Sequence, residues 1–170
     1  MLPLFAPMPA IRKRTPSQAA FGGVLRSFGL IQKVMRPYFQ QYGLSQAQWA
    51  ILRTLHRAQT EEGRENGLRM MELGQRLLVQ PPSVTTLVRR LVKSRLVTQV
   101  EAPNDRRGFE LRLTPKGEKL VERVLLAHQG QIRHVMGGLA DDELPVLGGY
   151  LERLNLHLAA LAAKIPDSSD

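Results

Sequence analysis

The chain has 170 residues, which suits one domain with a hydrophobic core, and its composition lies in the globular range. It contains no cysteine, which excludes disulfides, thiolate metal sites and cysteine redox switches. No apolar run approaches the roughly 20 residues that would span a bilayer, so we expect a cytoplasmic protein without a membrane segment. The net charge of +9 favours a polyanionic partner, either nucleic acid or an anionic surface, over a merely solubilising excess of charge.

Charge is unevenly distributed along the chain. Residues 1–60 carry eight Lys or Arg and no acid, and residues 83–119 carry nine basic side chains against four acidic ones. Residues 137–170 reverse the balance, with six acidic and two basic side chains. This distribution is typical of a protein with one side facing a polyanion and another side that is neutral or acidic.

The chain begins with a basic arm over residues 1–16, which we expect to be flexible and whose short apolar stretch is interrupted by Pro3, Pro7 and Pro9. Its apolar stretch precedes its positive charge, the reverse of the order in a secretory signal. Apolar residues then recur at helical spacing over 17–42. Ser17 is the candidate cap of this helix, Pro37 should bend or shorten it, and Gly43 should end it.

A second helix begins after Ser45, which forms a capping-box pattern with Gln48. Its apolar face carries Trp49, Leu52 and Leu55. A polar, glycine-containing loop over residues 61–67 separates it from a third, short helix over about 70–78.

The next helix, over 83–94, is strongly amphipathic. A turn over 80–84 precedes it, and Pro82 suits its first turn because the missing N–H costs nothing there. Two opposite stripes follow from helical spacing. The apolar stripe comprises Val84, Leu87, Val88, Leu91 and Val92, and the polar stripe comprises Ser83, Thr85, Thr86, Arg89, Arg90 and Lys93.

The apolar period then changes from that of a helix to that of strands. Residues 96–101 and 109–113 are rich in β-branched and aromatic residues, and residues 102–108 between them contain Pro, Asn, Asp and Gly. We therefore predict a β-hairpin whose turn is basic.

Two long helices complete the chain. Thr114 and Pro115 open the first, as a hydroxyl cap followed by proline, and it runs to about 136 before two glycines. Three acidic residues, 141–143, favour the start of the last helix through its dipole. That helix carries leucines spaced like a helix-packing seam, namely Leu144, Leu147, Leu151, Leu154, Leu158 and Leu161.

Short helices followed by a basic hairpin make a winged helix-turn-helix, in which the apolar stripe of the 83–94 helix holds it rigidly and leaves the other face free. No acid occurs from residue 73 to 100, so a contact of this face with a polyanion is favoured over an ordinary solvated helix, which mixes Glu with Lys and Arg. A major groove admits one helix, and a wing can place arginine at a minor groove. We expect Asp105 to support the wing, and we expect DNA contacts from Gln80, Pro82, Ser83, Thr85, Thr86, Arg89, Arg90, Lys93, Arg106 and Arg107.

Three stretches make the chain recognisable: LSQAQWAILRTL, MELGQRLLVQPPSVTTLVRRLVKSRLV and NDRRGFELRLTPKGEKL. Together they resemble the central part of the multiple antibiotic resistance regulator (MarR) family over about residues 44–120. The segment DRR followed by LTPKG is the most specific part. Arg95 stands where the family usually has glycine, so the resemblance implies a different turn after the recognition helix.

The resemblance implies a mainly α fold with a small β-wing, a winged helix-turn-helix carrying long N- and C-terminal dimerisation helices. Residues 44–114 would bind double-stranded DNA, and residues 17–43 and 115–164 would join two copies into a homodimer. The function implied is a sequence-specific, ligand-responsive repressor at a pseudo-palindromic operator. The expected dimer interface comprises Phe21, Leu25, Leu144, Leu147, Leu151, Leu154 and Leu158.

Family members often bind small aromatic or phenolic effectors, for which the candidate residues here are Tyr38, Tyr42, Trp49 and His56, although aromatics at helical spacing are more often core. We expect no cofactor and no metal site, because the four histidines lack ligand spacing. We also expect no enzyme, because no phosphate loop or nucleophile elbow is found. The alternative function is a sequence-tolerant architectural DNA-binding protein, which the acid-free first 60 residues suggest.

Overall fold

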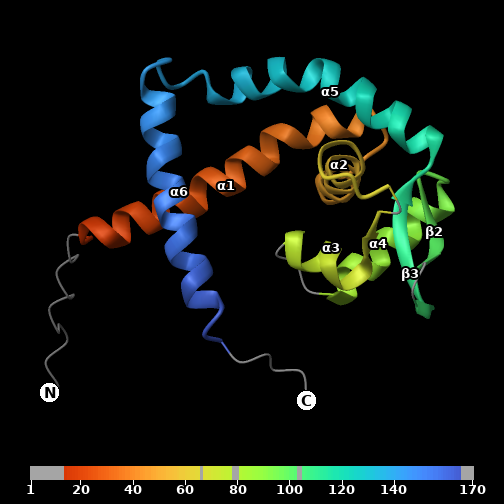
Figure 1. Ribbon diagram of the computed structural model, residues 1–170. Coiled ribbons are helices and arrows are strands. Elements are labelled where there is room, and N and C mark those ends of the chain that lie inside the picture. Colours follow the sequence, from red (N-terminus) through yellow and green to blue (C-terminus); the bar gives the residue numbers. More distant parts are fainter. Residues whose placement is uncertain (1–13, 66, 78–80, 103–104, 166–170) are drawn as a thin grey trace, which may run out of the picture. The chain divides into compact units, whose positions relative to one another are not determined.

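The computed structural model describes residues 14–65, 67–77, 81–102 and 105–165, with the backbone alone over 81–83, 102 and 105–108. The expected arm is therefore largely outside the described residues. The fold is mainly α with one small sheet (Figure 1). The elements are α1 (Pro16–Gln40), α2 (Gln46–Glu61), β1 (Leu68–Arg69), α3 (Met70–Leu77), α4 (Pro81–Lys93), β2 (Val97–Ala102), β3 (Asp105–Leu113), α5 (Pro115–Met136) and α6 (Glu143–Ala162).

The cap of α1 is Thr15, and the assignment of this role to Ser17 is wrong. Thr15 has an extended backbone, its hydroxyl accepts from the Gln18 N–H at 3.3 Å, and its own N–H donates to the Gln18 side chain at 3.0 Å. Pro16 then takes the first helical position, where its fixed φ suits the helix. Ser17 already lies inside the first turn. The helix continues through Pro37 and ends three residues later.

Two other predicted helix starts are confirmed. The Ser45 hydroxyl accepts from the Gln48 N–H at 3.2 Å, and the Gln48 side chain accepts from the Ser45 N–H at 2.9 Å. At the start of α5 the Thr114 hydroxyl accepts from the Gly117 N–H at 3.1 Å. Because each cap satisfies an N–H that has no helical partner, these two pairs fix where α2 and α5 begin.

The sheet is antiparallel, with strand order β1-β3-β2. The strand β1 was not predicted, because two residues are too few to show an alternating pattern. It pairs Leu68 with Leu111 across 43 positions of sequence. Gly67 precedes it with φ +95°, and a Cβ there would overlap the Leu111 carbonyl. Only glycine therefore lets the chain approach β3 this closely.

The hairpin differs from the prediction at its turn. Residues 102–108 were expected to form the turn, but β3 begins at Asp105, so only residues 103–104 lie between the strands. The register places Phe109 opposite Glu101 and Asp105 opposite Ala102. One step along β2, from Glu101 to Ala102, thus corresponds to four steps along β3, from Phe109 to Asp105. The three extra residues of β3 form an irregularity like a bulge. A bulge lets the ladder continue past residues whose composition alone favours a turn.

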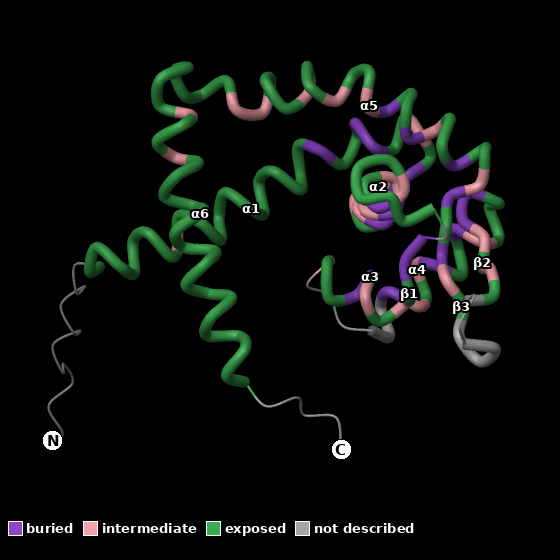
Figure 2. Tube along the Cα trace, in the orientation of Figure 1, coloured by how far each residue is buried: buried purple, intermediate pink, exposed green. Residues whose placement is uncertain are grey.

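The chain divides into two compact units, Met1–Ala127 and His128–Asp170. In the first unit, α2 packs against α1, α3, α4 and β3, and it supplies much of the core (Figure 2). Burying these apolar side chains is the main stabilising contribution to this unit. The fully buried side chains include Ile51, Leu52, Leu55, Leu68, Leu73, Val88, Leu91, Val121 and Val124.

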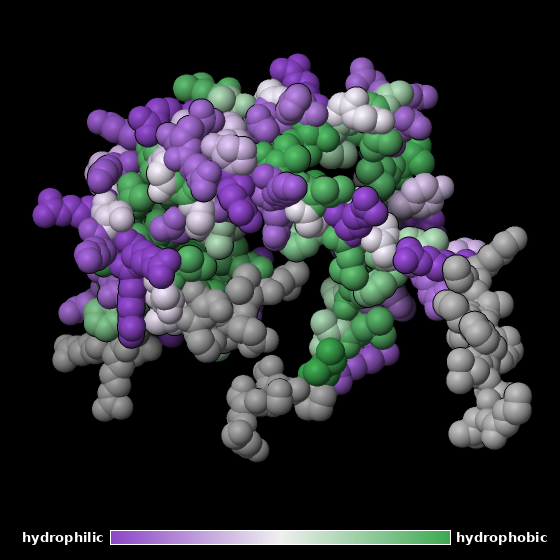
Figure 3. Space-filling view, turned by 180° about the vertical axis from the view of Figure 1, so that it is seen from behind, coloured by the Kyte–Doolittle hydropathy of each residue, from purple (hydrophilic) through white to green (hydrophobic). Residues whose placement is uncertain are grey.

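The second unit has no buried residue in its described part, 128–165. Its helix α6 exposes hydrophobic side chains over its whole length, as the helix that projects downward in Figure 3 shows. Of the predicted leucine seam, Leu144 and Leu147 are half-buried and the remaining members are exposed. Among the described residues no helix is long and apolar enough to cross a membrane.

Candidate nucleic-acid interface

Helix α4 carries the predicted division into two faces. Val84, Val88 and Leu91 are at most 1% exposed, and they anchor the helix in the core. On the opposite face Arg89 and Arg90 are exposed. Spacings of three, four and seven residues place Thr86, Arg89, Arg90 and Lys93 on this one face. All four are exposed.

The cations of this face are exposed to solvent. In the part of the chain that the structure describes, no carboxylate forms an ion pair with Arg89, Arg90 or Lys93. Thr85, also predicted as a contact, is half-buried. Gln80 lies outside the described residues, and so do the side chains of Pro82 and Ser83. The described part of the face therefore offers cations and a hydroxyl, the groups that contact phosphates and base edges.

The turn after α4 keeps the usual geometry in spite of Arg95, contrary to our expectation. Arg95 has φ +58°, in the left-handed region. Its N–H donates to Val92 at 2.9 Å and the Leu96 N–H donates to Leu91 at 3.0 Å, which is the Schellman pattern. The backbone bonds thus impose the conformation that glycine would adopt more easily.

The same turn is fastened to the start of α5. The Thr114 hydroxyl donates to the Arg95 carbonyl at 2.7 Å, and the Lys116 ammonium donates to the Ser94 carbonyl at 3.0 Å. Gly117 lies so close that a Cβ would overlap the Leu96 carbonyl. These hydrogen bonds satisfy carbonyls that the end of α4 leaves without helical partners. They also fix the orientation of α4 relative to the start of α5.

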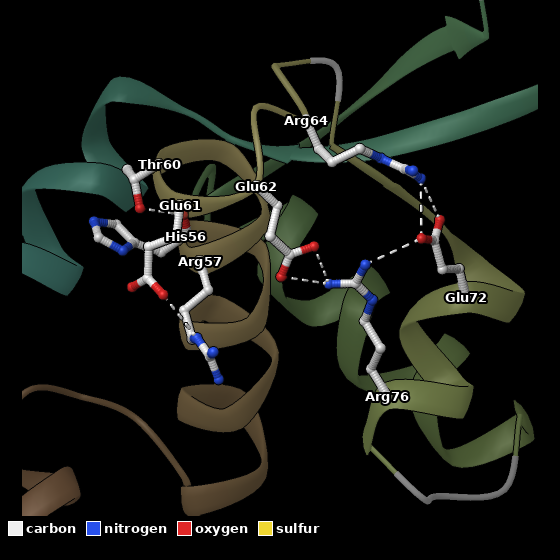
Figure 4. A network of polar contacts seen from close by, with 8 residues as sticks. All are labelled: His56, Arg57, Thr60, Glu61, Glu62, Arg64, Glu72 and Arg76. Atoms are coloured by element: carbon white, nitrogen blue, oxygen red, sulfur yellow. Dashed lines mark hydrogen bonds and ion pairs between the residues drawn. The ribbon is translucent and has the colours of Figure 1, made fainter.

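An ion-pair network that the sequence analysis missed holds α3 to the loop after α2 (Figure 4). Glu72 binds Arg64 at 2.7 Å and Arg76 at 3.2 Å, and Arg76 also binds Glu62 at 2.8 Å. The hydrogen bond that Arg76 donates to Glu62 is the largest cause that raises the pKa of Arg76 above its ordinary value. Sequence spacing signals only the Glu72 and Arg76 pair, at i,i+4. The other two pairs depend on the path of the loop.

A second cluster lies on α2, where Glu61 binds Arg57 at 3.1 Å and Arg53 at 3.4 Å. The hydrogen bond from Arg57 is the main cause that lowers the pKa of Glu61. Together the two clusters take up acidic side chains that flank the helix-turn-helix. Neither cluster includes a cation of α4.

The hairpin supplies the wing of the fold. The side chains of Asp105, Arg106 and Arg107 lie outside the described residues, so their predicted contacts stay predictions. In the described part of the hairpin, Arg112 is exposed on β3 and Phe109 is 54% exposed. The backbone register carries β3 beyond Phe109 to Asp105, which pairs with Ala102.

The four effector candidates differ in burial and in their neighbours. Tyr38 is buried, and its hydroxyl donates to the Val124 carbonyl at 2.9 Å. Burial and then Tyr42 raise the pKa of Tyr38 to about 12. Trp49 is buried and stacks on Phe39. His56 is half-buried, and its Nδ1 lies 3.2 Å from the Arg53 Nη1. Tyr42 lines a groove that residues of α5 also line. The effector role of the four residues stays a prediction.

The predicted interface residues of α1 are exposed, with Phe21 at 68% and Leu25 at 55%. They belong to an exposed apolar set on this helix that also includes Val24, Phe28, Ile31 and Val34. On α6, Leu151, Leu154 and Leu158 are likewise exposed. In the described residues no three His, Asp or Glu side chains are grouped as a metal ion would require.

The fold and this surface define a winged helix-turn-helix protein with a cationic, solvent-facing recognition helix. The sequence model of the MarR family matches residues 42–108. The transcriptional repressor YetL of Bacillus subtilis is 30% identical over 127 residues, which cover 72% of this chain and 73% of YetL. The chain therefore belongs to the MarR family of DNA-binding transcription regulators. These relatives are regulators and not enzymes.

Other known proteins agree with this assignment. The transcriptional regulator FarR of Neisseria gonorrhoeae is 32% identical over 103 residues, which cover 60% of this chain. The match spans 65% of the length of FarR, slightly less than two thirds. A mutant MarR of E. coli complexed with operator DNA shares the fold with a TM-score of 0.70 at 23% identity, over 79% of this chain and 93% of that one. The organohalide-sensing regulator RdhR in its 2,4-dichlorophenol-bound form also shares the fold, with a TM-score of 0.78 at 18% identity. This match covers 96% of this chain and 94% of that one.

Proposed function

We propose that this protein is a ligand-responsive repressor that binds a pseudo-palindromic operator as a homodimer and reads its sequence through α4. The observation that carries the proposal is the exposed face of α4, where cations that form no ion pair with any described residue lie opposite side chains that are at most 1% exposed. A rigid helix with such a face fits a major groove, in which Arg and Thr can contact base edges.

Exposed apolar helix faces support the homodimer. Large hydrophobic side chains are exposed along both α1 and α6, and contiguous apolar patches of this kind mark interaction surfaces in soluble proteins. A second copy supplies the same faces by symmetry, and two-fold symmetry would present two α4 helices to successive major grooves.

The relatives support the direction of regulation and the ligand response. YetL is named a repressor, and RdhR has been solved with 2,4-dichlorophenol bound. We extend both properties to this chain. The predicted arginines of the wing, Arg106 and Arg107, would add minor-groove or phosphate contacts, with Asp105 holding the wing in shape.

Footprinting on the DNA upstream of the chain's own gene, compared with random duplex DNA, tests the proposal. We expect a protected pseudo-palindrome, bound at least about 10³-fold more tightly than random DNA, with an affinity that falls steeply as salt rises. Equal affinity for all duplexes would refute sequence-specific regulation and would favour the architectural alternative.

Variants separate reading of the sequence from general affinity. Arg90→Ala or Thr86→Ala should change the preferred base at one position by about 1–3 kcal/mol. Arg107→Ala should instead weaken binding to all sequences and reduce the salt dependence. Arg133→Ala removes the same kind of side chain from the second unit and is the matched control. If Arg90→Ala behaved like the control, α4 would not face the DNA.

A further inference from the structure

The residues directly after α4 are held by two residues at the start of α5. The Lys116 ammonium donates to the Ser94 carbonyl at 3.0 Å. The Thr114 hydroxyl donates to the next carbonyl, that of Arg95, at 2.7 Å, and the Thr114 N–H donates to the Leu96 carbonyl at 3.1 Å. Three successive carbonyls are thus bound by one short segment, and we call these three hydrogen bonds the clasp.

Lys116 contributes a charge to the clasp as well as a hydrogen bond. The last carbonyls of a helix have no helical partners and carry a partial negative charge, so a cation beside them is stabilising. Ser94 follows the last residue of α4 directly, and its carbonyl is the one that the ammonium binds. A hydrogen bond from a charged donor is also stronger than one between neutral groups. Lys116 therefore satisfies a carbonyl and complements the charge of the helix end in one contact.

The clasp also joins the recognition helix to the wing. Val97, the first residue of β2, comes directly after the bound carbonyls and pairs with Leu113, which directly precedes Thr114. Gly117 lies so close that a Cβ there would overlap the Leu96 carbonyl. The end of α4, the base of the hairpin and the start of α5 are consequently joined at one place. A change in the clasp would alter the direction of α4 relative to the wing.

The reading of a DNA sequence depends more on this direction than general DNA affinity does. Side chains that contact base edges need the distances and angles of good hydrogen bonds, which a small rotation of the helix removes. Contacts of Lys and Arg with phosphates are mainly charge attraction and supply most of the non-specific binding. A residue that directs α4 without touching DNA should therefore affect the ratio of operator affinity to random-DNA affinity.

We infer that Lys116 is a positioning residue for sequence reading by α4, which acts through the Ser94 carbonyl and not through the duplex. The inference rests on the proposed function, because it concerns the preference for an operator. Lys119, one turn further along α5, provides an internal comparison. It is exposed like Lys116, but it forms no hydrogen bond or ion pair with another described residue.

Mobility-shift titration of the full chain tests the inference, with the operator found by footprinting and a random duplex as the two DNAs. Lys116→Met removes the ammonium but keeps an unbranched side chain. Lys119→Met removes the same charge from a side chain outside the clasp, and Lys116→Arg retains a cationic donor. Each affinity is measured at several salt concentrations, because the slope of log affinity against log salt reports the phosphate contacts. Thermal melting checks that the three variants are folded.

We expect Lys116→Met to lower the ratio of operator affinity to random-DNA affinity about three- to tenfold, as for the loss of one hydrogen bond. Its affinity for random DNA and its salt slope should equal those of the parent. Lys119→Met should leave the ratio, the random-DNA affinity and the slope unchanged, and Lys116→Arg should retain the ratio of the parent. A merely structural role would not produce this pattern, because partial unfolding lowers both affinities equally.

An unchanged ratio in Lys116→Met, an equal loss in Lys119→Met, or a loss that Lys116→Arg shares would overturn the inference. Weaker binding of Lys116→Met to every duplex, with a salt slope reduced by about one, would overturn it as well, since the ammonium would then bind a phosphate. A parent protein without a preferred operator would refute the proposed function and the inference together, and the parent shows this before any variant is measured. Failure of the variants alone, with a specific parent, would refute only the role of Lys116.

Discussion

Replacing Arg95 with glycine should stabilise the protein. Arg95 has φ +58°, a conformation that costs an L-residue roughly 1–2 kcal/mol. Glycine removes this cost but loses more backbone freedom on folding, by roughly 0.5–1 kcal/mol. Glycine also keeps the backbone bonds of the turn, because they involve only N–H and carbonyl groups. The net expectation for Arg95→Gly is a gain of about 0.5–1 kcal/mol in the free energy of unfolding.

Urea unfolding at one fixed protein concentration measures this gain, since the stability of a dimer depends on concentration. In thermal melting it corresponds to a rise of about 1–4 °C for a chain of this length. Arg95→Ala is the matched control, because alanine removes the side chain but keeps the Cβ that disfavours positive φ. An equal gain from alanine and glycine would show that the long side chain, and not the backbone, is unfavourable. No gain from glycine would refute the assigned strain.

Three further predictions concern packing, pH and salt. Gly117→Ala should lower the free energy of unfolding by about 1–3 kcal/mol, because the added Cβ would overlap the Leu96 carbonyl. Gly130→Ala on the same helix is the control: its Cβ meets no neighbour within 4 Å, so the change should be neutral or stabilising. Urea unfolding of both variants measures the difference. The pKa of Tyr38 is raised to about 12. The stabilisation linked to the protonated Tyr38 hydroxyl is therefore fully present below the ordinary pKa near 10 and is lost as pH rises through 12. Tyr38→Phe should flatten the loss of stability between these two pH values. Glu72→Gln should lower the unfolding midpoint at low salt, because it removes the ion pairs with Arg64 and Arg76. At about 1 M salt, where the Debye length is about 3 Å, the midpoint of the variant should differ little from that of the parent. An equally large difference at high salt would show that lost ion pairs do not cause the destabilisation.

The recognition helix was predictable because its signals are local. The apolar spacing of α4 lies within one helix, and it correctly identified Val84, Val88 and Leu91 as the buried face. The caps of α2 and α5 were predictable for the same reason, since each joins residues three positions apart. Such patterns report the period of the backbone directly.

The features that sequence reasoning missed depend on residues far apart in the chain or on competition between neighbours. The pairing of β1 with β3 requires the chain to return over more than 40 positions. At the hairpin, turn-forming residues were outweighed by strand pairing that continues to Asp105. At the start of α1, two hydroxyl residues compete, and Pro16 decides in favour of Thr15 because proline fits the position after the cap.

Arg95 shows how tertiary contacts can override a local preference. Glycine is the favoured residue at this turn, yet Thr114 and Lys116 bind two successive carbonyls there and hold the same path with arginine in place. Because both contacts come from the cap and first turn of α5, the direction of the recognition helix depends on that helix.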